Sequence, residues 1–317
     1  VDEGIKNWNQ GNLKKAKAIF LKAKKIDLNF EVTSFLGVIE LQQNNFALGI
    51  SNLEESYSMN PKNSLTTDNL ASGYLNYGLQ LIEERRIQDG QELFLKAIKI
   101  KPNFAEVYFN LGKVLYGIKD YIEALKFLNK AVEIKPDIFQ SYNLIGLIYK
   151  NNNQPKKAIT FFQKSLQYNP HNFDAQHNLG NCYSELKDYR EAIKIYKNLI
   201  DTDKKKYSYL YSDILHLKKC EYSWGDYDFY LNEINEFINK TNGYVNNFNL
   251  LSISDNLSLL QKNAKKTSKA IYPKLPLNVK LKNENNKIKI AYFSLDFKDH
   301  AVGRLVKNLF KNHNRKK

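Results

Sequence analysis

Cysteine and long apolar runs are scarce in this sequence of 317 residues, and each scarcity excludes a class of protein. The two cysteines, Cys182 and Cys220, lie too far apart for a disulfide framework or a zinc site, which fits a reducing cytoplasm. No apolar run approaches the roughly 18 residues that a membrane-spanning helix needs. The chain starts with Val-Asp-Glu-Gly, without a secretory signal or an initiator Met. We therefore predict a cytoplasmic protein with no structural metal and no membrane segment.

Positive charge, by contrast, is abundant. The chain has 48 basic and 33 acidic side chains, which give a net charge of +15. A basic surface can attract nucleic acid or acidic partners. The lysines are scattered over predicted helix faces, however, and no aromatic platform or base-reading motif lies among them. Because charge alone is a non-specific signal, we interpret these lysines as solvated helix faces and expect no nucleic-acid partner.

Small residues recur at fixed spacing along the first two thirds of the chain. A glycine is followed after 12 residues by Gly or Ala, after 4 more by an aromatic residue or Leu, and after 3 more by Ala or Ser in most copies. A proline often follows after 5 more residues. The three central glycines are 34 residues apart. The copies begin at Gly4, Gly37, Gly78, Gly112, Gly146 and Gly180.

This period resembles the tetratricopeptide repeat, in which each unit is a pair of antiparallel helices. Small residues let paired helices approach closely, and the larger residue fills the groove between them. Proline suits the turn after a helix ends. We therefore predict an all-α tetratricopeptide-repeat superhelix, an α-solenoid, over residues 1–206. The step from Gly37 to Gly78 is longer, so the extra residues near 63–69 form either a polar loop or a longer helix start.

Repeat arrays of this kind are scaffolds whose concave face binds extended segments of other proteins. Asn76, Asn110 and Asn178 each lie two residues before a repeat glycine, so they would stack on successive turns. An amide side chain offers both a donor and an acceptor, which matches a peptide backbone. Leu144 interrupts the row. Two interpretations stay open: a peptide-binding row, or a general bias of the composition toward Lys and Asn.

Beyond the repeats the fixed spacing fades, but helical periodicity persists. We predict a helical bridge over residues 207–272. Its helices are expected at residues 207–217, at 227–238, and from 255 or 256 to about 271.

The end of the chain changes character. Two prolines and a polar run predict a linker at residues 273–287. Residues 288–293 alternate like a β-strand, and residues 301–311 follow as an amphipathic helix that Asp299 can cap. Residues 288–317 therefore predict the first strand-helix unit of an α/β domain. In such domains ligands bind beyond the carboxyl ends of the strands.

The order of repeats, bridge and strand resembles the protein O-GlcNAc transferase family, including its bacterial and SPINDLY-like members. Residues 224–227, Trp-Gly-Asp-Tyr, are similar to the family's Trp-Ser-Asp-Tyr segment. Residues 248–255 are similar to its Phe-x-Leu-Leu-x-x-x-Asp stretch. Residues 290–300 match its Gly-Tyr-x-Ser-x-Asp-Phe-x-x-His motif, except that Ala291 replaces Gly and Leu295 an often-found Pro.

The resemblance implies a two-lobed, GT-B-like glycosyltransferase. Such an enzyme passes a sugar from a nucleotide sugar, usually UDP-GlcNAc, to Ser or Thr of proteins that the repeats bind. It marks His300 as a candidate catalytic residue, because His300 matches the family's active-site histidine. At a helix start the ring would tend to stay neutral, and a capping role for His300 is the alternative.

Most of such a catalytic domain is missing from this sequence. We therefore expect a fragment cut from a longer parent, inactive by itself and binding no cofactor. The nucleotide sugar would be bound only by the parent enzyme. The alternative is a non-catalytic tetratricopeptide scaffold for protein-protein interaction. The residues leave open whether the parent would transfer GlcNAc or fucose, and which proteins would accept it.

Overall fold

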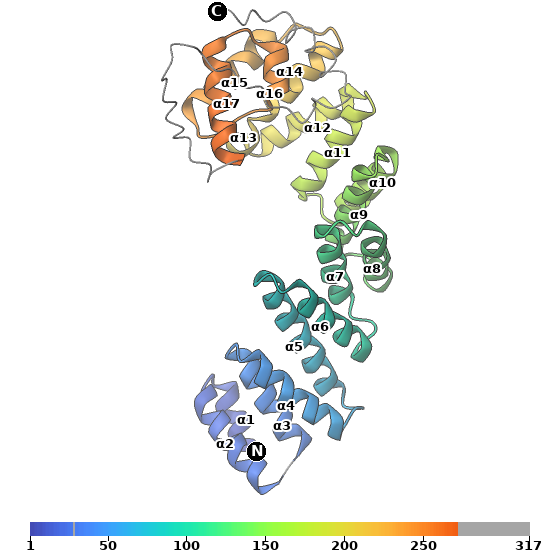
Figure 1. The fold of residues 1–317 in the computed structure, drawn as a ribbon, viewed down its shortest axis with the longest axis vertical. Coiled ribbons are helices and arrows are strands. Elements are labelled where there is room, and N and C mark those ends of the chain that lie inside the picture. The colour runs from blue at the N-terminus through green and yellow to red at the C-terminus, as the bar shows by residue number, and fades with distance from the viewer. Residues whose placement is uncertain (28, 272–317) are drawn as a thin grey trace, which may run out of the picture. The chain divides into compact units, whose positions relative to one another are not determined.

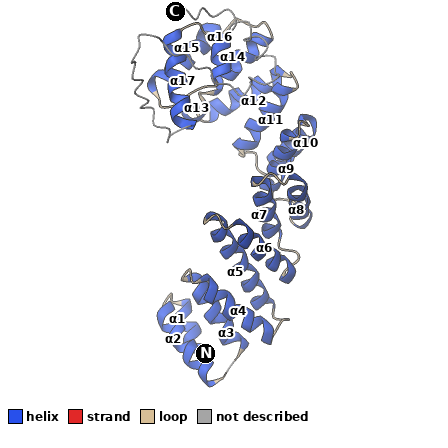
Figure 2. Ribbon diagram, in the orientation of Figure 1, coloured by secondary structure: helices blue, strands red, loops and turns tan. Residues whose placement is uncertain are grey.

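The computed structural model describes residues 1–27 and 29–271, and the only regular element in them is the α-helix (Figures 1 and 2). A compact unit comprises Val1–Ala264, and a second unit begins at Lys265. None of the described helices is long and apolar enough to cross a membrane. The predicted linker, the strand-helix unit and His300 lie outside the described residues.

Twelve consecutive helices pair into six hairpins, one for each copy of the glycine spacing (Figure 1). The predicted all-helical repeat fold is thus confirmed for this part of the chain. The pairs are α1 (Asp2–Asn9) with α2 (Leu13–Ile26), α3 (Phe30–Gln42) with α4 (Phe46–Met59), α5 (Ser64–Glu83) with α6 (Ile87–Ile100), α7 (Ala105–Gly117) with α8 (Tyr121–Ile134), α9 (Phe139–Asn151) with α10 (Pro155–Tyr168), and α11 (Phe173–Glu185) with α12 (Tyr189–Thr202).

The repeat glycines lie where the two helices of a hairpin touch. A Cβ atom added to Gly146 would lie 2.7 Å from the ring of Phe162, and one added to Gly180 would lie 2.5 Å from the ring of Tyr196. The Phe162 ring is fully buried, as is Ala158 beside it. The spacing in the sequence therefore records steric contact: the aromatic ring occupies the volume that the glycine leaves free.

The turn inside each hairpin has one repeated geometry. At Lys119 the backbone enters the left-handed region with φ 65°, and the Asp120 N–H donates to Leu115 O at 2.9 Å. This is the hydrogen-bonding pattern of a Schellman helix end, which satisfies carbonyls that the helix leaves unpaired. The equivalent positive-φ residues of the other five hairpins are Gly11, Asn44, Arg85, Asn153 and Lys187.

The irregular step between the second and third copies is a longer helix. Helix α5 has 20 residues, and the Asn63 side chain caps it by accepting a 2.8 Å hydrogen bond from Thr66 N. Of the two alternatives for residues 63–69, the longer helix start is confirmed.

Five more helices follow the sixth hairpin: α13 (Lys204–Tyr207), α14 (Leu210–Cys220), α15 (Tyr227–Lys240), α16 (Asn247–Ile253) and α17 (Leu257–Ile271). The expected helix at 207–217 is present but shifted by three residues, and the helices near 227 and 256 lie where they were expected. Helix α16 overlaps the motif segment 248–255, for which the sequence predicts no helix.

The repeat geometry continues past residue 206. Tyr222 has φ 58°, and the next residue, Ser223, donates to Lys218 O at 2.9 Å, as in the six turns before it. Helices α14 and α15 thus form a seventh hairpin. Leu215 occupies the position of the repeat glycine, and Tyr230 that of the small residue on the second helix. Both side chains are buried.

The segment after α15 is held by one buried amide. The Asn263 side chain is fully buried, accepts a 2.9 Å hydrogen bond from Val245 N and donates a 3.0 Å bond to Val245 O. A side chain that pairs with both backbone groups of one residue fixes it as a neighbouring strand would. This contact positions residues 242–249 beside α14.

Candidate functional site

A cleft of about 800 Å³ lies beside α11 and α14, the first helices of the last two hairpins. The segment of residues 242–249, which Asn263 holds, lines another side, and Tyr196 of α12 and Phe237 of α15 complete the lining. The polar and aromatic side chains that line the cleft include His177, Asn181, Tyr196, Tyr209, Asp213, His216, Phe237, Tyr244 and Asn249. The cleft thus brings amides, imidazoles, phenols and a carboxylate together.

Asp213 lies in register with the predicted asparagine row. It is two residues before Leu215, which takes the glycine position of the seventh hairpin, just as Asn178 is two residues before Gly180. We call these positions the first-helix row. Its members on α5, α7, α9, α11 and α14 are Asn76, Asn110, Leu144, Asn178 and Asp213.

The members of the row differ in exposure. Asn76 is exposed, Asn178 is half-buried, and Asn110 is buried with 8% of its surface exposed. The Asn110 Nδ2 donates to Glu106 O at 2.8 Å within its own helix. The Asn110 amide thus keeps its oxygen and one N–H for other partners. Whether these side chains bind a peptide stays a prediction.

Asp213 is the one carboxylate among the residues that line the cleft. Its Oδ1 accepts a hydrogen bond from Asn249 Nδ2. Burial raises the pKa of Asp213 to about 6, and the Asn249 hydrogen bond opposes this only in part. No Lys, Arg or His pairs with this carboxylate among residues 1–27 and 29–271. Near neutral pH the cleft thus holds a negative charge without a counter-ion.

Two histidines face the same space. Burial lowers the pKa of His177, and nearby Lys150 adds to this; burial and Lys219 act in the same direction on the pKa of His216. The His216 Nδ1 lies 3.0 Å from Ser252 Oγ. Both rings are therefore neutral near pH 7 and can act as hydrogen-bond donors or acceptors.

Tyrosine rings form the walls. The Tyr196 hydroxyl donates to Asn181 Oδ1 at 2.6 Å, and the Tyr209 ring lies 6.0 Å from the His177 ring. Burial and the charge on Asp213 raise the pKa of both tyrosines, that of Tyr209 to about 12. These hydroxyls stay protonated, so the cleft combines neutral aromatic surface with a single anionic group.

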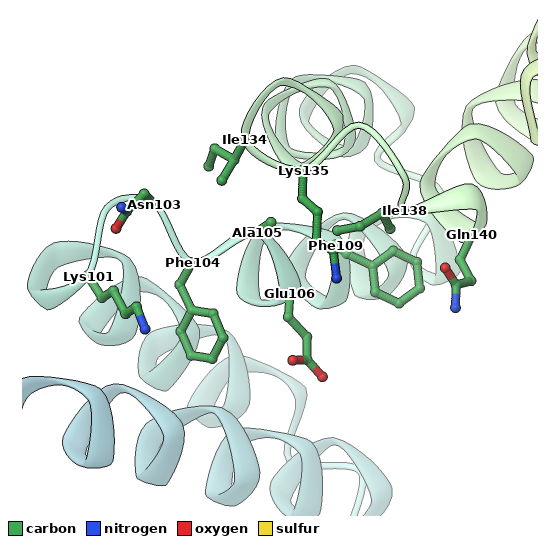
Figure 3. A pocket seen from close by; sticks show the side chains of 10 residues that line it. All are labelled: Lys101, Asn103, Phe104, Ala105, Glu106, Phe109, Ile134, Lys135, Ile138 and Gln140. Atoms are coloured by element: carbon green, nitrogen blue, oxygen red, sulfur yellow. The ribbon is translucent and has the colours of Figure 1, made fainter. Parts of the chain in front are cut away.

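A second groove of about 920 Å³ lies between the loop that joins α6 to α7 and the loop that joins α8 to α9 (Figure 3). One of its charged groups is engaged within the fold. Lys101 pairs with Asp68 at 2.7 Å and lies 5.0 Å from the centre of the Phe104 ring. The Glu106 carboxylate also lines this groove but is exposed to solvent, whereas Asp213 is half-buried. The cleft beside α14 is therefore the stronger candidate for a binding site.

The described residues hold no group of three or more His, Cys, Asp or Glu that could bind a metal ion. The cleft instead offers hydrogen-bonding amides, neutral rings and one carboxylate. Such groups can bind an extended polar ligand and hold it in one orientation.

Sequence reasoning missed His177, Asp213, His216 and Asn249. The signal that could have found Asp213 is the register: Leu215 lies seven residues before its turn residue, as each repeat glycine does. Asn249 had no such signal, because the segment that carries it lies outside the repeat spacing.

Comparison with models of protein families identifies repeats in the part of the chain that forms the helical hairpins. Models of the tetratricopeptide repeat match residues 105–138 and 151–214. These two segments of the chain match tetratricopeptide repeats. The second match runs past residue 206 into α14, where the repeat geometry continues.

Two of the similar solved structures are described as TPR proteins. The C-terminal part of a TPR repeat-containing protein from Cytophaga hutchinsonii is 15% identical, with 82% of this chain and 98% of that chain covered at a TM-score of 0.53. MamA is 24% identical, with 53% of this chain and 95% of that chain covered at a TM-score of 0.42. YrrB is described as a TPR protein with an unusual peptide-binding site. It is 17% identical, with 58% of this chain and 92% of that chain covered at a TM-score of 0.45.

No curated protein matches the sequence. The Cytophaga hutchinsonii structure supports the helical repeat fold. The matched models describe the repeat alone, so the resemblance to protein O-GlcNAc transferases stays a prediction.

Proposed function

We propose that this chain is a protein-binding scaffold that holds an extended segment of a partner protein along the first-helix row, with the cleft beside α14 as its anchor. The observation that carries this proposal is the position of Asp213. One register connects the predicted asparagine row to a cleft in which polar groups converge. Protein-protein interaction is also a role to which a repeat fold is suited.

The chemistry of the row fits a peptide backbone. An extended peptide carries one N–H and one C=O per residue, and these need partners when a scaffold covers them. The row amides Asn76, Asn110 and Asn178 offer both a donor and an acceptor on one side chain. An amide row therefore binds backbone with little dependence on the partner's side chains.

Replacing the row should test the proposal. We expect the triple substitution Asn76→Ala, Asn110→Ala and Asn178→Ala to weaken binding of peptides to the full chain, because each lost hydrogen bond costs about 0.5–1.5 kcal/mol. Fluorescence anisotropy with labelled random-sequence peptide pools measures the change. The melting temperature should change little.

The matched control is Asn129→Ala, Asn198→Ala and Asn232→Ala, which removes three exposed asparagines from second helices α8, α12 and α15. It should leave affinity unchanged. Equal effects of the two triple variants would contradict a role for the row.

Sugar transfer by a longer parent protein is the second candidate. One observation favours it: two of the motif segments pack together. The Trp224 and Tyr227 rings lie 5.9 Å apart, and the Tyr227 hydroxyl donates to Ile253 O. We propose this activity only for a parent that continues into two α/β lobes, with His300 at its active site. Transfer of radiolabelled GlcNAc that survives His300→Ala at the full rate would contradict the assignment of His300.

A further inference from the structure

We infer that the cleft beside α14 receives a basic side chain of the bound segment, a lysine ammonium or an arginine guanidinium, with the Asp213 carboxylate as its counter-ion. The inference deepens the proposed function and rests on it. The class of partner it names is an extended protein segment with a basic anchor residue.

The first argument is the unpaired carboxylate. One oxygen of Asp213 accepts from Asn249, and no protein cation pairs with the group among the described residues. Among the other titratable groups that line the cleft, His177, His216, Tyr196 and Tyr209 are neutral near pH 7. A half-buried anion without a partner is costly, and an incoming cation removes that cost.

The second argument is the wall around the carboxylate. No Lys or Arg lines the cleft, and the rings of Tyr196, Tyr209, Phe237 and Tyr244 do. Aromatic surface packs against the methylene stem of a lysine or the plane of a guanidinium, and ring faces attract the charged head. A carboxylate in a cleft lined by aromatic rings therefore suits a long basic side chain better than a small cation, which would leave the rings uncovered.

The third argument is contrast with the rest of the chain. The net charge of +15 repels a uniformly basic partner. A site that accepts one cation within such a surface selects segments in which a single basic residue is set among neutral or acidic ones. The basic surface disfavours further cations on the partner, and the Asp213 carboxylate favours one; together the two effects give specificity.

The test uses the full chain and four labelled peptide pools. Each pool has one fixed central residue, namely Lys, Arg, norleucine or Glu, flanked on both sides by random mixtures of Ala, Ser, Thr, Val and Gln. Norleucine keeps the length of the lysine stem and lacks its charge. Fluorescence anisotropy at pH 7.5 should show the Lys and Arg pools binding about tenfold or more tightly than the norleucine pool, and the Glu pool binding weakest.

Two variants make the result specific. Asp213→Asn keeps the shape of the side chain and an oxygen for Asn249, so it should fold and should bind the Lys and norleucine pools equally. Asp228→Asn removes the same charge from an exposed position on α15 outside the cleft and should keep the tenfold preference.

The outcomes separate this inference from the proposed function. Wild-type protein that binds all four pools equally overturns the inference and leaves the scaffold function standing. Wild-type protein that binds none of them overturns both. A preference for Lys that persists in Asp213→Asn also overturns the inference, because the cation would then be held elsewhere.

Discussion

At the scale of single residues, Asp213 shows how one position of the repeat can carry a different functional group on a different helix. On α5, α7 and α11 the same position carries an amide, and on α14 it carries a carboxylate that residues 242–249 partly cover. The sequence predicted the amide positions because repeat glycines marked them. It did not mark Asp213, because Leu215 stands where the glycine would be, and burial by a segment outside the repeat cannot be read from spacing.

The raised pKa of Asp213 makes stability depend on pH. Its folded-state pKa of about 6 lies above the usual value of about 3.9. Between these values the folded state binds more protons than the unfolded state, so this group lowers the free energy of unfolding as pH rises from about 4 to 6. Since one pKa unit corresponds to about 1.4 kcal/mol and the group opens to a solvent-filled cleft, the loss should be on the order of 1–2 kcal/mol.

We expect Asp213→Asn to remove this loss and to be more stable than the wild type at pH 7. Urea denaturation of both proteins at pH values from 4 to 7 measures it. If the unfolding free energies of the two proteins changed with pH in parallel, burial of the Asp213 carboxylate would not destabilise the fold.

At the scale of helices, steric contact between paired helices decides what the sequence reveals. Six hairpins were predictable because Gly or Ala must stand where the helices touch. The seventh hairpin was hidden because Leu215 and Tyr230 occupy those two positions, and the turn that joins α14 to α15 is longer. Helix α16 has seven residues, too few for a periodic pattern to mark it.

The contact at Gly146 predicts a measurable cost. Gly146→Ala places a Cβ atom 2.7 Å from the buried Phe162 ring, so the ring or the helix must move. Overpacking of this kind should lower the free energy of unfolding by about 1–3 kcal/mol. Chemical denaturation measures the change.

Gly117→Ala is the matched control. This glycine is the last residue of α7, and an added Cβ would meet no atom within 4 Å. Alanine is the better helix former by roughly 0.5–1 kcal/mol, so the variant should be neutral or slightly more stable. If both substitutions had the same effect, the close approach at Gly146 would not limit packing.

At the scale of the whole molecule, stability and binding have different sources. A repeat protein is held together by contacts within a hairpin and between neighbours, and these were largely predictable from the spacing. The cleft depends on residues 242–249, which are held by the buried Asn263 and belong to no repeat. The sequence therefore predicted the scaffold and the row, whereas the group that distinguishes this chain from a generic repeat array emerged only from the fold.

The most direct test of the scaffold account is hydrogen exchange of the full chain with and without saturating Lys-centred peptide pool. Backbone amides of residues 242–249 and of α11 and α14 should exchange more slowly when the pool is bound, because a ligand in the cleft stabilises the closed state of the elements that line it. Amides on the exposed faces of α8 and α10 should not change. Slower exchange confined to α8 and α10, or no change anywhere on binding, would contradict the proposal that this chain holds its partner along the first-helix row and in the cleft.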